Sequence, residues 1–150
     1  MRIVVDTNVL VRATKRSTGP AREVLRIFES EQHILVLSRF IVTELLRVLN
    51  YDRLLPVHRL TLPEQQEYVA AVEKLAELVE VLPTAKPEAV SRDPEDDPVI
   101  ATAVAGRAGV LCTLDHHLLH PDVRAYCASR GVRVMTDVDL LRLLQKPADA

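Results

Sequence analysis

The sequence predicts an α/β domain built on a mostly parallel sheet. Short aliphatic and β-branched runs alternate with longer segments that carry one apolar face, which is the pattern of repeated strand–helix units. The chain has 150 residues, of which 48% are hydrophobic and 27% charged, so it can bury the core of one domain. No repeat, low-complexity segment or linker divides it. We therefore expect a single domain over residues 1–150, with a frayed tail from about residue 146.

The N-terminal part is predicted to contain two strands and two helices. Residues 3–5 form a short β-branched run, which is typical of a strand buried on both faces. Residues 20–31 have the apolar spacing of a helix, and residues 34–37 form a second aliphatic strand. Ser38 is a suitable N-cap for a following helix that runs to about residue 50.

A long helix is predicted to open the central part. Glu64 follows Thr61 by three residues, which is the spacing of a capping box, and the helix is expected to end near residue 78. Residues 79–82 are predicted as a third strand. A polar loop follows, with a short helical turn expected at residues 87–91.

The C-terminal part continues the same alternation. Asp97 followed by Pro98 is typical of a helix start, and Gly131 is typical of a helix end. The elements expected there are a helix from residue 98, a strand at 110–113, a helix at 121–130, a strand at 132–135 and a final helix capped by Thr136.

The charge distribution and the aromatic content indicate how well the chain is suited to bind a nucleic acid. The net charge is −2, but residues 1–60 carry ten lysines and arginines against six acids, and arginine outnumbers lysine by 15 to 4. Arginine binds phosphate well in a bidentate manner, although genome composition or thermal adaptation explains such a bias equally well. Aromatic residues make up 3% of the chain, which does not favour base stacking on an aromatic platform.

The two cysteines and the lengths of the apolar runs indicate where in the cell the protein is expected. Cys112 and Cys127 lie in apolar segments and are expected to be reduced, buried side chains, and no Cys/His spacing indicates zinc. No apolar run is long enough to cross a bilayer, and the first strand begins too early to leave room for a signal peptide. We therefore expect a cytoplasmic protein with no membrane partner.

Four carboxylates in apolar settings are the candidate functional residues. Asp6 and Asp115 each follow a predicted strand, Asp97 opens a helix, and Glu44 lies within an apolar helical segment. Sites in parallel sheets form outside the carboxyl ends of the strands, so these acids can converge. Converging acids repel one another, and a divalent cation such as Mg²⁺ or Mn²⁺ would relieve that repulsion.

Each acid also has a purely structural explanation. Asp97 is a good N-cap, Asp6 could begin a turn, and Asp115 could cap a short helix through His117–His120. Glu44 is harder to explain in this way, because a buried glutamate without a partner is costly. His116, His117 and His120 are expected to be surface or loop residues, since the proline that follows them limits any helix there.

Taken together, the motifs resemble those of a known family. They are Asp6-Thr7-Asn8-Val9-Leu10 after the first strand, Ser38 followed by Glu44, Asp97-x-x-Ile100-Ala101, and Thr113-Leu114-Asp115. In this order and spacing the chain resembles the PIN-domain nucleases over roughly residues 2–144. The resemblance is greatest to the VapC-like group, the toxin components of toxin–antitoxin systems.

The resemblance implies a three-layer α/β/α fold around a parallel sheet of about five strands. It also implies an endoribonuclease that depends on Mg²⁺ or Mn²⁺. The family's catalytic acids carry over onto Asp6, Glu44, Asp97 and Asp115, with Asp6, Asp97 and Asp115 as metal ligands and Glu44 positioning a water. A single-stranded RNA substrate, a cognate antitoxin and a homodimer are the partners implied.

One departure from the family pattern and two neighbouring acids bear on the predicted metal site. His117 stands where many relatives have a further acid, which leaves a second metal position open. Asp93 and Asp96 match the family spacing less well than Asp97. Whether Asp96 assists Asp97 or replaces it as a metal ligand is left open.

Other function classes fit less well. A phosphatase with an aspartyl nucleophile usually needs a second aspartate two residues on, where this chain has Asn8. A phosphorylated receiver-like domain would need a lysine at the end of a later strand, and the later strands here end in Thr113 and Met135. A non-catalytic PIN-like binding module is the remaining alternative, and intact acids at all four places argue against it.

Overall fold

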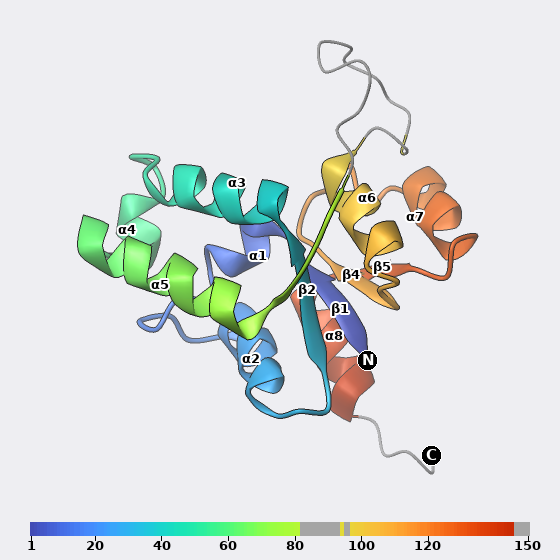
Figure 1. The fold of residues 1–150 in the computed structure, drawn as a ribbon, viewed down its shortest axis with the longest axis horizontal. Coiled ribbons are helices and arrows are strands. Elements are labelled where there is room, and N and C mark those ends of the chain that lie inside the picture. The colour runs from blue at the N-terminus through green and yellow to red at the C-terminus, as the bar shows by residue number, and fades with distance from the viewer. Residues whose placement is uncertain (82–93, 95–96, 146–150) are drawn as a thin grey trace.

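The computed structural model describes residues 1–81, 94 and 97–145, and in this part of the chain five parallel strands form one sheet (Figure 1). The strand order is β3-β2-β1-β4-β5. The predicted α/β class with a parallel sheet is confirmed. The strands are β1 (Arg2–Val5), β2 (Ile34–Ser38), β3 (Glu77–Val79), β4 (Val110–Cys112) and β5 (Arg133–Met135).

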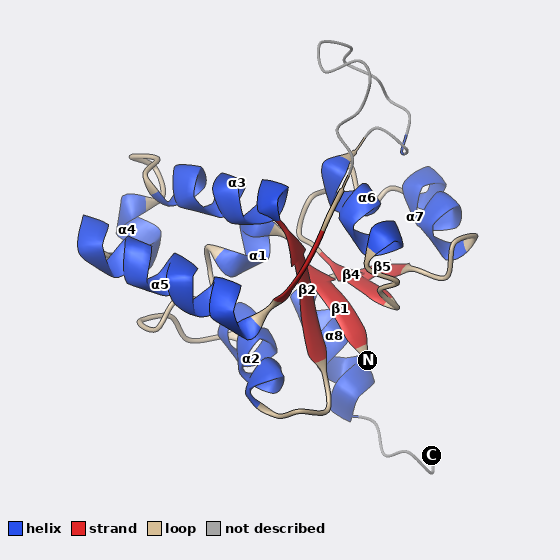
Figure 2. Cartoon of the chain, viewed as in Figure 1, coloured by secondary structure: helices blue, strands red, loops and turns tan. Residues whose placement is uncertain are grey.

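Helices lie on both faces of this sheet, which gives the three-layer α/β/α arrangement (Figure 2). Helix α6 contacts β1, β2 and β4, whereas α2 packs against α8. The described helices are α1 (Thr7–Leu10), α2 (Pro20–Arg26), the 3-10 helix η1 (Ile27–Glu29), α3 (Arg39–Leu49), α4 (Leu55–His58), α5 (Leu62–Leu75), α6 (Pro98–Ala105), α7 (Pro121–Ala128) and α8 (Asp137–Gln145).

Strand β1 is the centre of the core. It pairs with β2 on one side and with β4 on the other, and Ile3, Val4 and Val5 have at most 1% of their surface exposed. A strand covered by helices on both faces reads as a continuous apolar run rather than an alternating one. Because all strands are parallel, the carboxyl ends of β1, β2 and β4 meet at the same edge of the sheet.

The helix starts predicted from the sequence are confirmed. Ser38 Oγ accepts a hydrogen bond from the Ile41 amide at 3.5 Å, and Thr61 forms a full capping box with Glu64 at the start of α5. Asp97 Oδ1 accepts from the Val99 amide at 2.9 Å. Side-chain oxygens thus satisfy backbone amides that the first helical turn leaves without partners.

Boundaries in the central part differ from the prediction. Helix α5 ends at Leu75 rather than near residue 78, and β3 occupies residues 77–79 rather than 79–82. The register of β3 is set by β2, with Glu77 opposite Val36, and Glu77 also forms an ion pair of 2.8 Å with Arg2. Tertiary pairing therefore decides this boundary. The turn predicted at 87–91 lies outside the described residues.

Two short helices were missed by the sequence pattern, and one was predicted too long. Helix α1 spans a single turn after Asp6, and α4 is held by the buried ring of His58, whose nitrogens contact the Leu49 carbonyl at 2.7 Å and the Leu60 amide at 3.0 Å. One-turn helices have no apolar period to detect. The helix predicted at 20–31 ends at Arg26 and continues as η1.

The remaining expectations concern the cysteines, the histidines and the membrane. Cys112 and Cys127 are buried free thiols, as predicted, and burial raises the pKa of Cys127. His116, His117 and His120 are exposed, also as predicted. Within the described ranges, every helix is too short or too polar to span a bilayer. The extent of the domain over residues 1–150 stays a prediction, because residues 146–150 lie outside the described part.

Candidate active site

All four acids predicted as catalytic line one cavity of about 570 Å³. Asp6 follows β1 and caps α1, and Asp115 lies on the segment after β4. Asp97 caps α6, and Glu44 lies in the middle of α3. The cavity is therefore built where β1 and β4 end and where two helices begin beside them.

Asp6 is the most buried of the four, with 6% of its surface exposed. Its Oδ1 accepts from the Thr7 amide at 2.7 Å, and its Oδ2 accepts from the Thr113 hydroxyl at 2.8 Å. Burial raises the pKa of Asp6 above its ordinary value, these two hydrogen bonds oppose that rise, and the nearby charges of Asp97 and Asp115 add to it. Asp97 and Asp115 thus both act electrostatically on Asp6.

Thr113 and Asn8 join the two strand ends. The Thr113 hydroxyl, which donates to Asp6, also accepts from the Asp115 amide at 3.0 Å. The Asn8 side chain accepts from the Leu114 amide at 3.0 Å, and its amide group donates to Asp6 Oδ2 at 3.3 Å. A polar network therefore holds the segment after β1 against the segment after β4 and fixes where both aspartates lie.

Asp97 and Asp115 combine a local structural role with a place at the cavity. Asp97 is half-buried and caps α6 through Oδ1, and a carboxylate has a second oxygen for another contact. Asp115 is exposed, and its Oδ1 accepts from the His117 amide at 2.9 Å. In place of the short helix that Asp115 could have capped, the segment after it is a series of turns.

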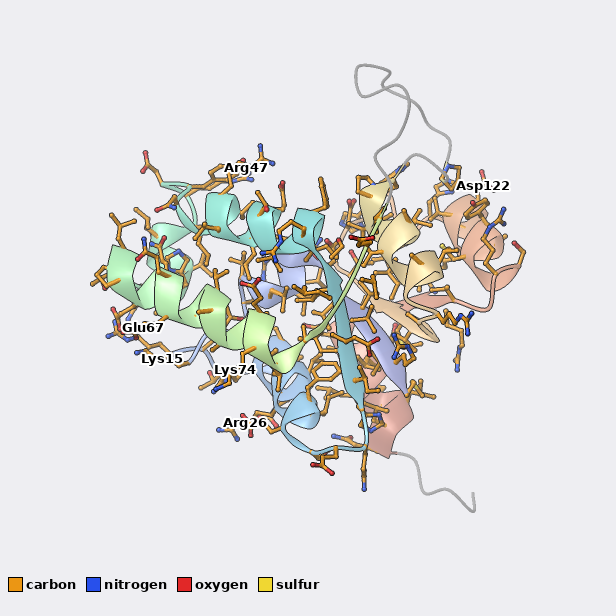
Figure 3. The ribbon with its side chains drawn as sticks, in the orientation of Figure 1. Lys15, Arg26, Arg47, Glu67, Lys74 and Asp122 are labelled. Atoms are coloured by element: carbon orange, nitrogen blue, oxygen red, sulfur yellow. The ribbon has the colours of Figure 1, made fainter. Side chains whose placement is uncertain are left out.

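Glu44 is set apart from the other three acids. It is half-buried, with 26% of its side-chain surface exposed, and its Oε2 is paired with Arg47 one helical turn further on. Figure 3 shows Arg47 on the side of α3 that faces away from the sheet. Glu44 therefore has a partner of opposite charge, which gives it the structural explanation that was not evident from the sequence. The acidic charges that raise the pKa of Asp6 beyond the effect of burial are those of Asp97 and Asp115.

A comparison with models of protein families shows to which family the chain belongs. The model of the PIN domain matches residues 2–117, which is more than half of the chain and contains all four acids. The chain belongs to the PIN domain family. No curated protein matches it. PIN domains are generally nucleases, and they typically bind divalent metal ions.

The residues of this PIN domain fit such an ion in their chemistry. Hard cations take carboxylate oxygens, and in the described part of the chain no lysine, arginine or histidine forms an ion pair with Asp6, Asp97 or Asp115. The hydroxyl of Thr7, which also lines the cavity, is buried without a hydrogen-bond partner among the described residues. Buried polar groups of this kind are normally satisfied, so the cavity has unmet polar capacity.

The acidic side chains of this PIN domain are spaced more widely than the ligands of a complete metal site. Among residues 1–81, 94 and 97–145, no three acidic, histidine or cysteine side chains are placed to hold one ion. Asp93 and Asp96 lie outside the described residues. The structure thus brings the predicted acids to one cavity, and in this conformation their carboxylates bond to backbone amides, hydroxyls and Arg47.

The sequence did not reveal several other residues of the site. Arg12, Phe40 and Arg53 also line the cavity. Thr102 on α6 donates to Ser38 Oγ at 2.8 Å, which ties the helix that Asp97 caps to the start of α3. Arg12 follows Asn8 by four residues, the spacing of one helical turn, and this was the only local signal for any of them.

Proposed function

We propose that this PIN domain is an endoribonuclease that depends on Mg²⁺ or Mn²⁺ and hydrolyses RNA phosphodiesters. The single observation that carries the proposal is that Asp6, Asp97 and Asp115 line one cavity, where burial raises the pKa of Asp6 and the charges of Asp97 and Asp115 raise it further. Like charges in such a setting are costly unless a cation compensates them. The family affiliation supports the same chemistry.

The roles of the residues follow from their positions. Asp6, Asp97 and Asp115 would hold the ion, which when bound supplies Lewis acidity and makes water a stronger nucleophile at neutral pH. Thr113 keeps the Asp6 carboxylate turned toward the cavity through its 2.8 Å hydrogen bond. Glu44 pairs with Arg47 through Oε2, so its Oε1 would be left to position the attacking water or help with its deprotonation.

We further propose that the protein is the toxin component of a toxin–antitoxin pair and works in the cytoplasm. The order and spacing of its acidic motifs, which resemble those of the VapC-like group, support this role. A cognate antitoxin would then inhibit by placing a cationic side chain among the acids, where complementary charge favours binding. Exposed apolar side chains, including Leu46, Val57 and Leu62, offer contact area for an antitoxin or for a second copy in a homodimer.

A second candidate is a binding module without catalysis. The observation in its favour is that no three acids of the described residues converge to hold one ion. An aspartyl phosphatase receives no such support, because Asn8 replaces the second aspartate and donates to Asp6 Oδ2.

The test compares Mn²⁺-dependent cleavage of single-stranded RNA by the wild type and by Asp6→Asn. Asp122→Asn is the matched control, because Asp122 is an exposed acid on α7 that does not line the cavity (Figure 3). We expect cleavage by the wild type and by Asp122→Asn, and a loss of at least about 100-fold in Asp6→Asn. Equal cleavage by all three would reject the assignment. Failure of the wild type to bind Mn²⁺ in calorimetry would favour the binding module.

A further inference from the structure

Phe40 is an aromatic side chain in an unusual place. The chain has two phenylalanines, of which Phe28 is buried in the core, whereas Phe40 keeps 43% of its surface exposed. Phe40 lines the same cavity as the four acids. An exposed apolar ring at the wall of a carboxylate-rich cavity contributes little to the core, and its position calls for a ligand with an apolar face.

The helix that carries Phe40 presents it rigidly. Phe40, Glu44 and Val48 are four residues apart on α3, so they form one stripe, and all three line the cavity. The adjacent stripe of the same helix is anchored in the core through buried side chains such as Ile41 and Leu45. The Ser38 cap and its 2.8 Å contact with Thr102 fix the first turn of α3 beside α6. The ring is therefore held on the same rigid frame as the acids.

Two arginines line the cavity without neutralising its acids. Arg12 is exposed, and its guanidinium donates to the Asn8 carbonyl at 2.9 Å rather than to a carboxylate. Arg53 is also exposed, and its guanidinium lies 5.5 Å from the centre of the Tyr51 ring. Within the part of the chain that the structure describes, neither arginine forms an ion pair. Both cationic groups thus remain available to an anionic ligand.

The scarcity of aromatic residues does not favour a stacking platform of several rings, but a single ring can bind a single base. We propose that Phe40 stacks on the base of an unpaired nucleotide next to the scissile phosphate, while Arg12 and Arg53 contact neighbouring backbone phosphates. This inference rests on the proposed nuclease function and names the recognition that goes with it. An aromatic ring beside cationic groups matches the base and the phosphates of one strand, and a base can reach the ring only when it is not paired. Since every base has a π-face, this contact selects single strands with little preference for sequence.

The first test distinguishes the effect of the aromatic ring of Phe40 from the effect of its apolar volume. Phe40→Leu removes the π-face and keeps an apolar side chain, and Phe40→Trp enlarges the π-face. Val138→Ala is the control at an exposed apolar residue on α8, outside the cavity. We expect Phe40→Leu to raise KM for single-stranded RNA about 10-fold with kcat within about threefold, and Phe40→Trp to match the wild type. Unchanged KM in Phe40→Leu overturns the proposal.

A second test locates the contact on the RNA. A single abasic site is moved along a short single-stranded RNA, and KM is measured for the wild type and for Phe40→Leu. At one position beside the cleavage point the abasic site should raise KM about 10-fold for the wild type and less than about twofold for Phe40→Leu. Equal penalties in both proteins at every position overturn the proposal.

A binding measurement distinguishes failure of this inference from failure of the nuclease assignment. Fluorescence anisotropy of labelled RNA without Mn²⁺ is measured in the Asp6→Asn background, where Phe40→Leu should weaken binding about 10-fold. Arg12→Gln and Arg53→Gln should each reduce the salt dependence of binding by about one phosphate contact, unlike Arg26→Gln on the distant α2 (Figure 3). If the wild type does not cleave RNA, the nuclease assignment fails. Binding that is insensitive to Phe40 overturns the stacking role in either case.

Discussion

The hydroxyl of Thr113 lies 2.8 Å from Asp6 Oδ2, across 107 residues of sequence. Strands β1 and β4 are neighbours, so the residues just past their carboxyl ends are brought side by side. The contact joins the aspartate after one strand to the segment that carries Asp115 after the other. One short hydrogen bond therefore couples the two strand ends on which the acidic cavity is built.

Removing this hydroxyl should impair both activity and stability. Thr113→Val keeps the shape of the side chain but deletes a hydrogen bond to a buried carboxylate, which should lower the free energy of unfolding by about 2 kcal/mol. The Thr113 bond lowers the pKa of Asp6, so its loss should move the acid limb of the pH–rate profile to higher pH. Urea unfolding and the pH profile measure the two effects. Thr113→Ser is the control that keeps the hydroxyl, and an unshifted acid limb in Thr113→Val would contradict the prediction.

The ionisation of Asp6 should oppose folding of the metal-free protein. Burial raises the pKa of Asp6 in the folded state, so protonation stabilises the fold fully below the unfolded value of 3.8, and that stabilisation is lost as pH rises through the raised folded pKa. Asp6→Asn has no charge to bury, although its single amide oxygen can accept from only one of Thr113 and the Thr7 amide. Relative to the wild type, its urea midpoint should therefore increase as pH rises from 3.8 through the raised folded pKa of Asp6, and the difference between the two proteins should be constant below 3.8. A difference that stays constant above pH 3.8 as well would speak against a titration of Asp6.

The contact between Ser38 and Thr102 should couple the two helices that flank the cavity. Their hydroxyl oxygens are 2.8 Å apart in a buried setting, at the start of α3 and within α6. A double-mutant cycle with Ser38→Ala and Thr102→Val should give a coupling free energy of about 1 kcal/mol in urea unfolding. Additive effects of the two substitutions would show that the hydroxyls do not stabilise each other.

Glu64 should make stability depend on acid pH. The Thr61 backbone amide and the Lys15 side chain hold the pKa of Glu64 at about 2. A lowered carboxylate pKa gives stabilisation that is present above the unfolded value of 4.5 and is lost as pH falls to about 2. Glu64→Gln keeps an oxygen for the capping box and lacks the charge. Its urea midpoint should be below that of the wild type at pH 7, and the two midpoints should converge near pH 2.

The sequence was informative where the chemistry is local or repeated. Strand runs that end in Asp6 and in Thr113-Leu114-Asp115 located the site, because parallel strands bring their carboxyl ends to one edge. The caps at Ser38, Thr61 and Asp97 were equally readable, since each depends on a side chain and an amide within three residues.

What the sequence did not reveal depends on distant partners. The register of β3 follows from its pairing with β2 and from the ion pair between Glu77 and Arg2, which are 75 residues apart. Phe40 and Arg53 reach the cavity because of how α3 and the segment after it pack, and no local spacing reports that. The ion pair between Glu44 and Arg47 could have been predicted from their three-residue spacing on a helix. It was missed because the apolar neighbours of Glu44 in the sequence indicated a buried side chain.

The place of β4 in the sheet has a consequence for the order of assembly. This strand inserts between β1 and β5, and its partner β1 lies more than 100 residues earlier in the chain. We expect pairings between such distant segments to form late, because the entropy cost of closing a long loop comes before the contact stabilises the chain. Asp6 and Asp115 therefore reach one cavity only once β1 and β4 have paired. We expect the acidic cavity, and with it the nuclease activity that we propose, to form late in folding.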